Sequence, residues 1–192
     1  MLRSLRCALI AAFASLAFAG AAHAAGGNYV FDGGTAKEQA QVRAALNVSA
    51  FNWSLVPAQI TIHIAANLAS SDATPGEIWL DSALLDSGVF SWGIVQHEYA
   101  HEVDFYLLDD AKRATLAPLL GGQAWWPAPG THYAHGQLTC ERFASTLAWS
   151  YWPSVRNSMK PQSRNDESAA MAPAAFRALM AKVLAAPVAT TA

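Results

Sequence analysis

Cysteine is scarce in this chain of 192 residues, which contains only Cys7 and Cys140. Cys7 lies in an N-terminal stretch that is expected to be removed, so Cys140 would remain alone in the mature protein. A lone cysteine excludes an intrachain disulfide, even in a compartment that would permit one. The fold must therefore be stabilised by a hydrophobic core, with or without a metal, rather than by disulfides.

Long apolar runs are confined to the N-terminus. Residues 1–24 begin with Arg3 and Arg6, continue with an apolar run from Cys7 to Phe18 and end in Ala22-His23-Ala24. This layout is typical of a secretory signal peptide, and the apolar run is short for a membrane anchor. We predict that residues 1–24 are cleaved and that the mature protein is secreted or periplasmic. No later segment is apolar and long enough for stable membrane insertion.

Basic residues are also few. The chain has 12 Lys and Arg against 14 Asp and Glu, and removing the two signal-peptide arginines leaves 10 against 14, a net charge of −4. It has no basic stripe with interleaved aromatic residues, so nucleic acid is not an expected partner. Cleavage of 24 of the 192 residues leaves 168, without an internal repeat, which suits a single domain over residues 25–192.

The spacing of apolar residues predicts both helices and strands, and hence an α+β fold. Helices are expected after the capping residues Thr35, Ser91 and Thr139. The polar segment 154–172 is expected to be irregular. The predicted elements are helices over 35–46, 92–108, 139–151 and 173–186, the end of a helix at 116–120, and strands over 59–65 and 77–80.

Residues 97–101 read HEYAH and indicate a metal site. Residues four apart share one face of a helix, so His97 and His101 can direct two imidazoles at one ion. Imidazole suits zinc, and Glu98 can act as the general base towards a zinc-activated water. The same groups could instead form an ordinary polar face, because the surrounding apolar residues would make a helix without any metal.

A catalytic zinc typically takes three protein ligands, so one more is needed. The metzincin position, six residues after the second histidine, is Leu107. Asp104 lies about 10 Å along the helix axis from His97, too far to share an ion. It is expected either to accept a hydrogen bond from an imidazole or to lie on the surface, and Glu102 is expected to be solvated. Glu141, in the helix predicted over 139–151, is the predicted third ligand, although a first-turn glutamate also complements the helix dipole without any metal.

HEYAH followed at a distance by ERFA resembles the gluzincin class of zinc metallopeptidases. HEYAHEVDFY, with a tyrosine eight residues before ERFAS, is similar to the catalytic core of the anthrax lethal factor family, over roughly 77–151. The resemblance implies a zincin-like domain with one Zn2+ per chain, held by His97, His101 and Glu141. It also implies that the strand Glu77–Leu80 lines the cleft as a sheet edge and pairs with extended substrate.

The resemblance further implies that Tyr133 stabilises the oxyanion, although its spacing departs from the family by one residue. A donor there must face the developing negative charge, and His132 and His135 could serve equally well. Trp125 is expected either to line a substrate subsite or to cover the core. Cys140, without a base partner, is expected to be a small buried side chain.

Together these features predict a small zincin-like α+β domain, in which a short mixed sheet packs on the active-site helix and the C-terminal half is helical. The predicted activity is that of a secreted zinc metallopeptidase, an endopeptidase acting on a peptide or protein substrate. Two alternatives stay open: a metal-stabilised secreted binding module without catalysis, and a zinc hydrolase that acts on a non-peptide bond.

Overall fold

The computed structural model describes residues 26–186, which adopt the α+β fold expected from the sequence. The predicted signal peptide lies outside the described residues. None of the helices within 26–186 has the length and apolar character needed to cross a membrane.

A four-stranded mixed sheet forms the N-terminal part of the fold. In sheet order its strands are β1 (Tyr29–Gly33), β2 (Ile60–Ala65), β4 (Glu77–Asp81) and β3 (Asp72–Thr74). The first three are parallel, and β3 is antiparallel to β4. The prediction that 77–80 is a sheet edge is wrong, because a tight turn at Gly76 (φ 90°) lets the preceding residues pair outside β4. The two edge strands are β1 and β3, and β3 lies outside β4.

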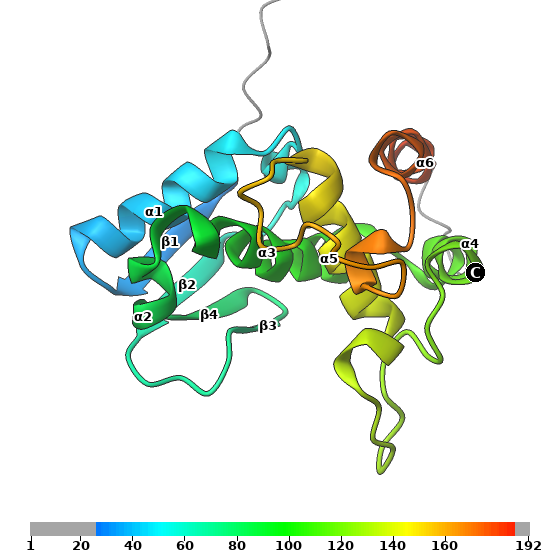
Figure 1. Ribbon diagram of the computed structural model, residues 1–192, viewed down its shortest axis with the longest axis horizontal. Coiled ribbons are helices and arrows are strands. Elements are labelled where there is room, and N and C mark those ends of the chain that lie inside the picture. Colours follow the sequence, from blue (N-terminus) through cyan, green and yellow to red (C-terminus); the bar gives the residue numbers. More distant parts are fainter. Residues whose placement is uncertain (1–25, 187–192) are drawn as a thin grey trace, which may run out of the picture.

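Helices fill the rest of the fold, with α3 at its centre. In Figure 1, α3 runs through the middle of the molecule, with the sheet and α1 on one side and α5, α4 and α6 on the other. The helices are α1 (Ala36–Val48), α2 (Ser82–Asp86), α3 (Ser91–Leu107), α4 (Asp110–Leu120), α5 (Thr139–Tyr151) and α6 (Pro173–Ala185). Short 3-10 turns occur at Trp53–Leu55, Gly88–Phe90, His135–Gln137 and Glu167–Ala169.

The predicted helix caps are confirmed for one helix and wrong for two. At α1, Thr35 Oγ1 accepts from the backbone N–H of Glu38, and the Glu38 carboxylate accepts from that of Thr35, a complete capping box. The hydroxyls of Ser91 and Thr139 instead donate to the carbonyl oxygens of Gly88 and Gly121. Both residues therefore lie inside the first turn of their helix.

The core lies between the sheet and the inner helices. Because side chains alternate along a strand, β2 and β4 direct their apolar residues to one face. Those residues are Ile60, Ile62, Ile64, Ile78 and Leu80, at most 5% exposed. They share one cluster with Val95, Tyr99 and Val103 of α3, with Phe143 and Leu147 of α5, and with Phe176 of α6. Helix α3 is thus enclosed from several sides, and its polar side chains need partners inside the protein.

Residues 152–172, called the strap below, connect α5 to α6 without regular structure apart from one 3-10 turn, as predicted for most of their length. The strap is nevertheless tied down. The buried Asn157 donates through Nδ2 to the carbonyl oxygens of Ala148 and Trp152. The strap crosses α3 at Gly93, where an added Cβ would lie only 2.2 Å from Asn157 Oδ1. A side chain at this position would displace the strap.

Candidate metal centre

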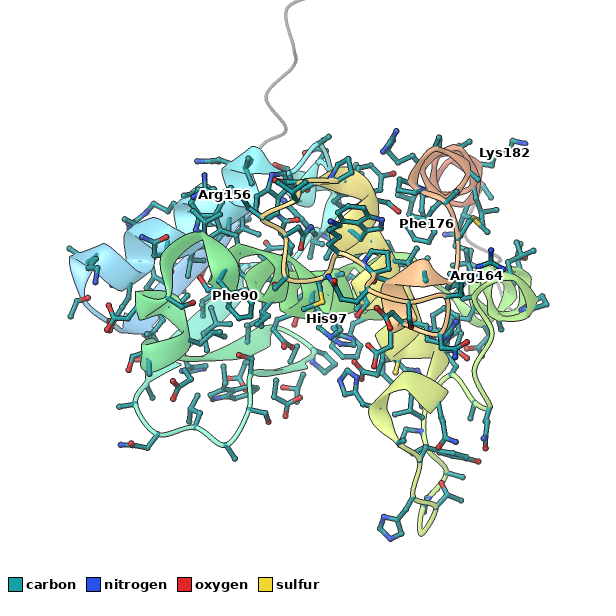
Figure 2. All side chains as sticks on the ribbon, viewed as in Figure 1. Phe90, His97, Arg156, Arg164, Phe176 and Lys182 are labelled. Carbon is teal, nitrogen blue, oxygen red and sulfur yellow. The ribbon has the colours of Figure 1, made fainter. Side chains whose placement is uncertain are left out.

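Three ligand atoms from two helices converge in the middle of the molecule. Nε2 of His97 lies 3.2 Å from Nε2 of His101 and 3.2 Å from Oε2 of Glu141, and His101 Nε2 lies 3.3 Å from the same oxygen. Ligands about 2.0–2.1 Å from a tetrahedral zinc are about 3.3 Å apart, so the triangle has the size of one face of such a site. Figure 2 shows His97 between the sheet-bearing half and the C-terminal helices.

Local structure explains how the three atoms meet. His97 and His101 lie one turn apart on the same face of α3, so both rings project in one direction. Glu141 lies in the first turn of α5, which packs closely along α3. The apolar residues Phe143, Ala144 and Leu147 hold that contact and are fully buried. The ligand geometry is thus set by helix packing and does not depend on a flexible loop.

Glu98 lies next to the first histidine and is only 6% exposed. One of its carboxylate oxygens and one ring nitrogen from each of His97 and His101 lie within 4.8 Å of one another. Burial raises the pKa of Glu98, although the two histidines act to lower it. A raised pKa makes a carboxylate a stronger base, which suits a group that accepts a proton and returns it.

Glu141 is the electrostatic counterpart of the histidines. Burial acts to raise its pKa, but the contacts of its carboxylate with His101, His135 and His97 outweigh burial and hold the pKa well below its ordinary value. The pKa of His101 is raised, because contact with Glu141 outweighs its own burial. The lowered pKa favours the ionised carboxylate, which is the form that binds a cation.

His135 is a fourth group at this centre. The sequence left the oxyanion donor open among Tyr133, His132 and His135. Nε2 of His135 lies 2.9 Å from Oε2 of Glu141, and its Nδ1 lies 2.8 Å from Oε1 of Glu167. Hydrogen bonds to Glu141 and then to Glu167 raise its pKa to about 10. His97, His135 and Glu141 form a second group whose atoms lie close enough to hold an ion. His135 can therefore act at this centre as a donor or as a ligand.

The other two candidates lie in the segment between α4 and α5, which projects from the body of the molecule (Figure 1). His132 is exposed and Tyr133 is half-buried. Within residues 26–186, the ring from this segment that reaches Glu141 is that of His135. The oxyanion role of Tyr133 stays a prediction.

A cleft of about 270 Å³ opens beside the centre, and Glu98 is one of its lining residues. Its lining residues are Ser70, Ser71, Leu84, Ile94, His97, Glu98, His135, Ser145, Met159 and Glu167. A larger depression of about 640 Å³ lies along the strap beside Trp149, and Arg164 is the one titratable group in its lining. Of these two hollows, the smaller one is lined by His97, Glu98 and His135.

Asp104 fits neither of its two predicted places. It is fully buried, its Oδ1 accepts from Arg113 Nε at 2.8 Å, and its Oδ2 accepts from Trp125 Nε1 at 2.8 Å. Trp125 also packs against Phe143 of the core, with ring centroids 5.9 Å apart. Trp125 therefore covers the core, which is one of its two predicted roles.

Glu102, predicted to be solvated, is completely buried. Its Oε2 accepts from the backbone N–H of Gly76 at 3.0 Å, which ties the turn between β3 and β4 to α3. Burial raises its pKa to about 7, although that hydrogen bond acts to lower it. The burial of Glu102 could not be predicted from sequence periodicity, because the turn that covers it connects β3 and β4.

Cys140 is 1% exposed, which confirms that it is a buried side chain. Burial is also the main cause that raises the pKa of its thiol above the ordinary value. A thiol that stays protonated is a poor nucleophile, so Cys140 is not a candidate for covalent catalysis.

Glu167 was missed by the sequence reasoning altogether. It lies in the strap, in a polar segment without periodicity, and reaches the centre through His135 and Ser145. No sequence signal distinguishes it from the other polar residues of that segment, because its place depends on the path of the strap over α5.

Comparison of the chain with family models, curated proteins and solved structures gives no match. The resemblance carried by HEYAH and ERFAS therefore stays a prediction. A functional assignment has to be built on the side-chain geometry described above.

Proposed function

We propose that the protein is a zinc-dependent metallopeptidase of the gluzincin type. The observation that supports this best is the triangle formed by His97 Nε2, His101 Nε2 and Glu141 Oε2, with sides of 3.2–3.3 Å. Two imidazoles and one carboxylate are a donor set found in catalytic zinc sites, and the spacing fits a tetrahedral ion with its fourth position open. The donor set therefore suits one Zn2+ per chain.

The side chains around the triangle provide the remaining functions of a peptidase. When bound, the zinc ion supplies a Lewis acid that polarises the scissile carbonyl and acidifies a water molecule. Glu98 takes the proton of the attacking water and passes it to the leaving amine. His135 can donate an N–H to the oxygen that becomes negative, and Tyr133 is the alternative donor.

The position of β3 favours a peptide over other substrates. β3 is an edge strand, so one row of its backbone N–H and C=O groups can pair with an extended chain. It runs beside α3, the helix that carries His97, Glu98 and His101. The Gly76 to Glu102 hydrogen bond holds this edge beside α3. A substrate strand paired with β3 would lie along the cleft.

The proposal includes export. Residues 1–24 would direct secretion and be removed, leaving residues 25–192 as a single zincin-like domain with a peptide or protein substrate and without a membrane or nucleic acid partner. A secreted or periplasmic location also agrees with the chemistry, because the site relies on histidine and carboxylate ligands and needs no reduced thiol.

The first test measures zinc per chain in purified mature protein, before and after reconstitution. Wild type is compared with Glu141→Ala, and Glu77→Ala serves as a control that removes an exposed carboxylate outside the triangle. We expect about one zinc in wild type and in the control. Glu141→Ala should bind zinc much more weakly, because one of three ligands is lost.

The alternative outcomes are equally informative. A wild type that binds no zinc even after reconstitution would rule out the metallopeptidase proposal. Equal zinc binding by Glu141→Ala would keep a metal site but transfer the third position to His135. Zinc binding without hydrolysis of any peptide, ester or glycan substrate would favour the binding module.

A further inference from the structure

A chain of hydrogen bonds links the strap to both sides of the metal centre. Nδ1 of His97 lies 3.1 Å from Ser145 Oγ, and that oxygen lies 3.0 Å from Oε2 of Glu167. The other oxygen of the same carboxylate, Oε1, lies 2.8 Å from His135 Nδ1. One side chain from outside the zinc-ligand helices therefore touches the environment of two histidines at once.

The chemistry of these groups fixes the direction of the hydrogen bonds. An ionised carboxylate can only accept, so Ser145 donates its single hydrogen to Glu167. Its other neighbour, the thioether of Met159 at 3.7 Å, is a weak acceptor and does not compete. The serine oxygen then accepts from His97, whose Nδ1 must carry the proton. The lone pair of His97 is thereby left on Nε2, the atom in the ligand triangle.

The second arm acts on His135 in the same way. Glu167 Oε1 accepts from its Nδ1–H and turns Nε2 of the ring towards Glu141. The residue after His135 is glycine, and a Cβ at Gly136 would lie 3.1 Å from the Glu167 side chain. The absence of a side chain at this position gives the carboxylate room to pass beneath the turn that carries His135.

The backbone at Glu167 is also held in place. Its carbonyl oxygen accepts from Thr146 Oγ1, a fully buried hydroxyl on α5. Burial acts to raise the pKa of the Glu167 carboxyl group, but hydrogen bonds from His135 and Ser145 outweigh burial and lower it. Both ends of the residue are therefore fixed against the helix that supplies Glu141.

We infer that Glu167 is a positioning residue of the metal centre, which orients His97 through Ser145 and His135 directly. This inference rests on the proposed zinc site. It assigns a role in the site to the strap, which is otherwise only a connection between α5 and α6. A hydrogen-bond partner behind a ligating histidine typically changes metal affinity by about 10–100-fold.

The test compares zinc dissociation constants, measured by competition with a chelator, for wild type, Ser145→Ala, Glu167→Ala and the double variant. Each single variant should bind zinc about 10–100-fold more weakly. The double variant should bind no more weakly than Glu167→Ala alone, because the serine arm is already lost. Glu167→Gln, which keeps the volume and one acceptor oxygen, should fall between wild type and Glu167→Ala.

Asp166→Asn is the matched control. It removes a carboxylate one residue away that binds Ser163 within the strap, and it leaves the contacts to the two histidines intact. If Asp166→Asn weakens zinc binding as much as Glu167→Ala, the effect comes from the folding of the strap and the inference is overturned. Zinc binding by Glu167→Ala within twofold of wild type would overturn it as well.

A second measurement is independent of metal. In metal-free protein, at a pH where His97 is neutral, its ring 15N shifts should report the Nδ1–H tautomer. Ser145→Ala and Glu167→Ala should shift the ring towards Nε2–H, because Glu141 is then the nearest acceptor. An unchanged tautomer would contradict the inference. A wild type that binds no zinc would end the proposed function, and the tautomer would still decide the role of Glu167.

Discussion

The middle and the C-terminal end of α3 bury polar groups in opposite ways. At its C-terminal end, Asp104 faces Arg113 and Trp125, whose nitrogens are obligatory donors, so each carboxylate oxygen has a partner. In the middle of the helix, His97 and His101 direct ring nitrogens at Glu141 and at each other. A triangle of two imidazole nitrogens and a carboxylate oxygen has too few protons to satisfy every pair when the rings are neutral.

The difference separates a structural ion pair from a candidate binding site. The Asp104 cluster is complete and has nothing further to bind. The ligand triangle is stable without a ligand only if protons fill its centre, and a cation can take their place. Burial raises the pKa of Asp104 and of Glu98 alike, so perturbed acidity alone does not distinguish the two regions. The two regions differ in whether each buried acceptor atom has a hydrogen-bond donor.

The largest effect expected in the triangle region is catalytic. Glu98→Gln keeps the shape of the side chain but removes the base, so hydrolysis of a peptide substrate should fall about 10²–10⁴-fold. Zinc content should stay at the wild-type level, because Glu98 is not one of the three ligands. Steady-state rates and metal analysis on the same preparation check both statements. Retained activity would exclude Glu98 as the base.

The largest effect expected in the Asp104 region is on stability. Arg113→Met leaves a buried carboxylate without its cation and should lower the free energy of unfolding by about 3 kcal/mol, near the lower end for such pairs because Arg113 is partly exposed. Urea unfolding measures the change. The zinc dissociation constant of the folded variant should equal that of wild type. A loss of zinc affinity would mean that the two regions are coupled.

Zinc should stabilise the protein through the ligand triangle and not through the Asp104 cluster. At a free zinc concentration 100 times its dissociation constant, the free energy of unfolding should rise by about 2.7 kcal/mol in wild type and in Arg113→Met. Chelation with EDTA should reverse the rise. In Glu141→Ala, the same zinc concentration should have little effect. Thermal unfolding with and without zinc shows whether the gain follows the triangle.

A smaller, pH-dependent effect is expected from Glu102, which lies between the two regions. Its pKa of about 7 in the folded state exceeds its ordinary value of 4.5, so the folded protein holds more protons between these pH values. Stability should therefore fall as pH rises from about 4.5 to 7. Relaxation of the protein around the buried carboxylate lowers the cost of ionising it, so we expect a fall of about 1–2 kcal/mol rather than the full value.

Glu102→Gln should remove this fall, because the amide keeps an acceptor for Gly76 and carries no charge. Urea unfolding of metal-free wild type and variant at pH 5 and pH 8 measures it. The variant should gain stability relative to wild type at the higher pH. An equal difference at both pH values would show that Glu102 does not titrate in this range.

Local interactions explain which parts of the fold could be predicted from the sequence. The capping box of α1 lies within four residues, and apolar periodicity located α3, α5 and α6 to within one or two residues. The strand Asp72–Thr74 was missed, because three residues carry no readable alternation. Its pairing outside β4 also made the predicted sheet edge wrong.

The candidate site divides in the same manner. His97, Glu98 and His101 could be placed because helical spacing alone puts them together, and Glu141 followed from the helix predicted over 139–151. The contacts of His135 and Glu167 could not be predicted, since both residues lie in irregular segments whose path is set by contacts far along the chain. Asp104 and Glu102 were misplaced because their partners, Arg113 and Gly76, belong to elements that no spacing rule relates to α3.

The strap has a consequence for the order of events during synthesis. His97 and His101 leave the ribosome almost together, and Glu141 follows 44 positions after His97. Glu167 is made later still, 22 positions after its partner Ser145. A nascent chain therefore presents two imidazoles long before it can complete the centre around them. We expect chains truncated before the strap to hold zinc weakly and to lack peptidase activity. The potentially harmful chemistry of a peptidase would then belong only to the finished chain.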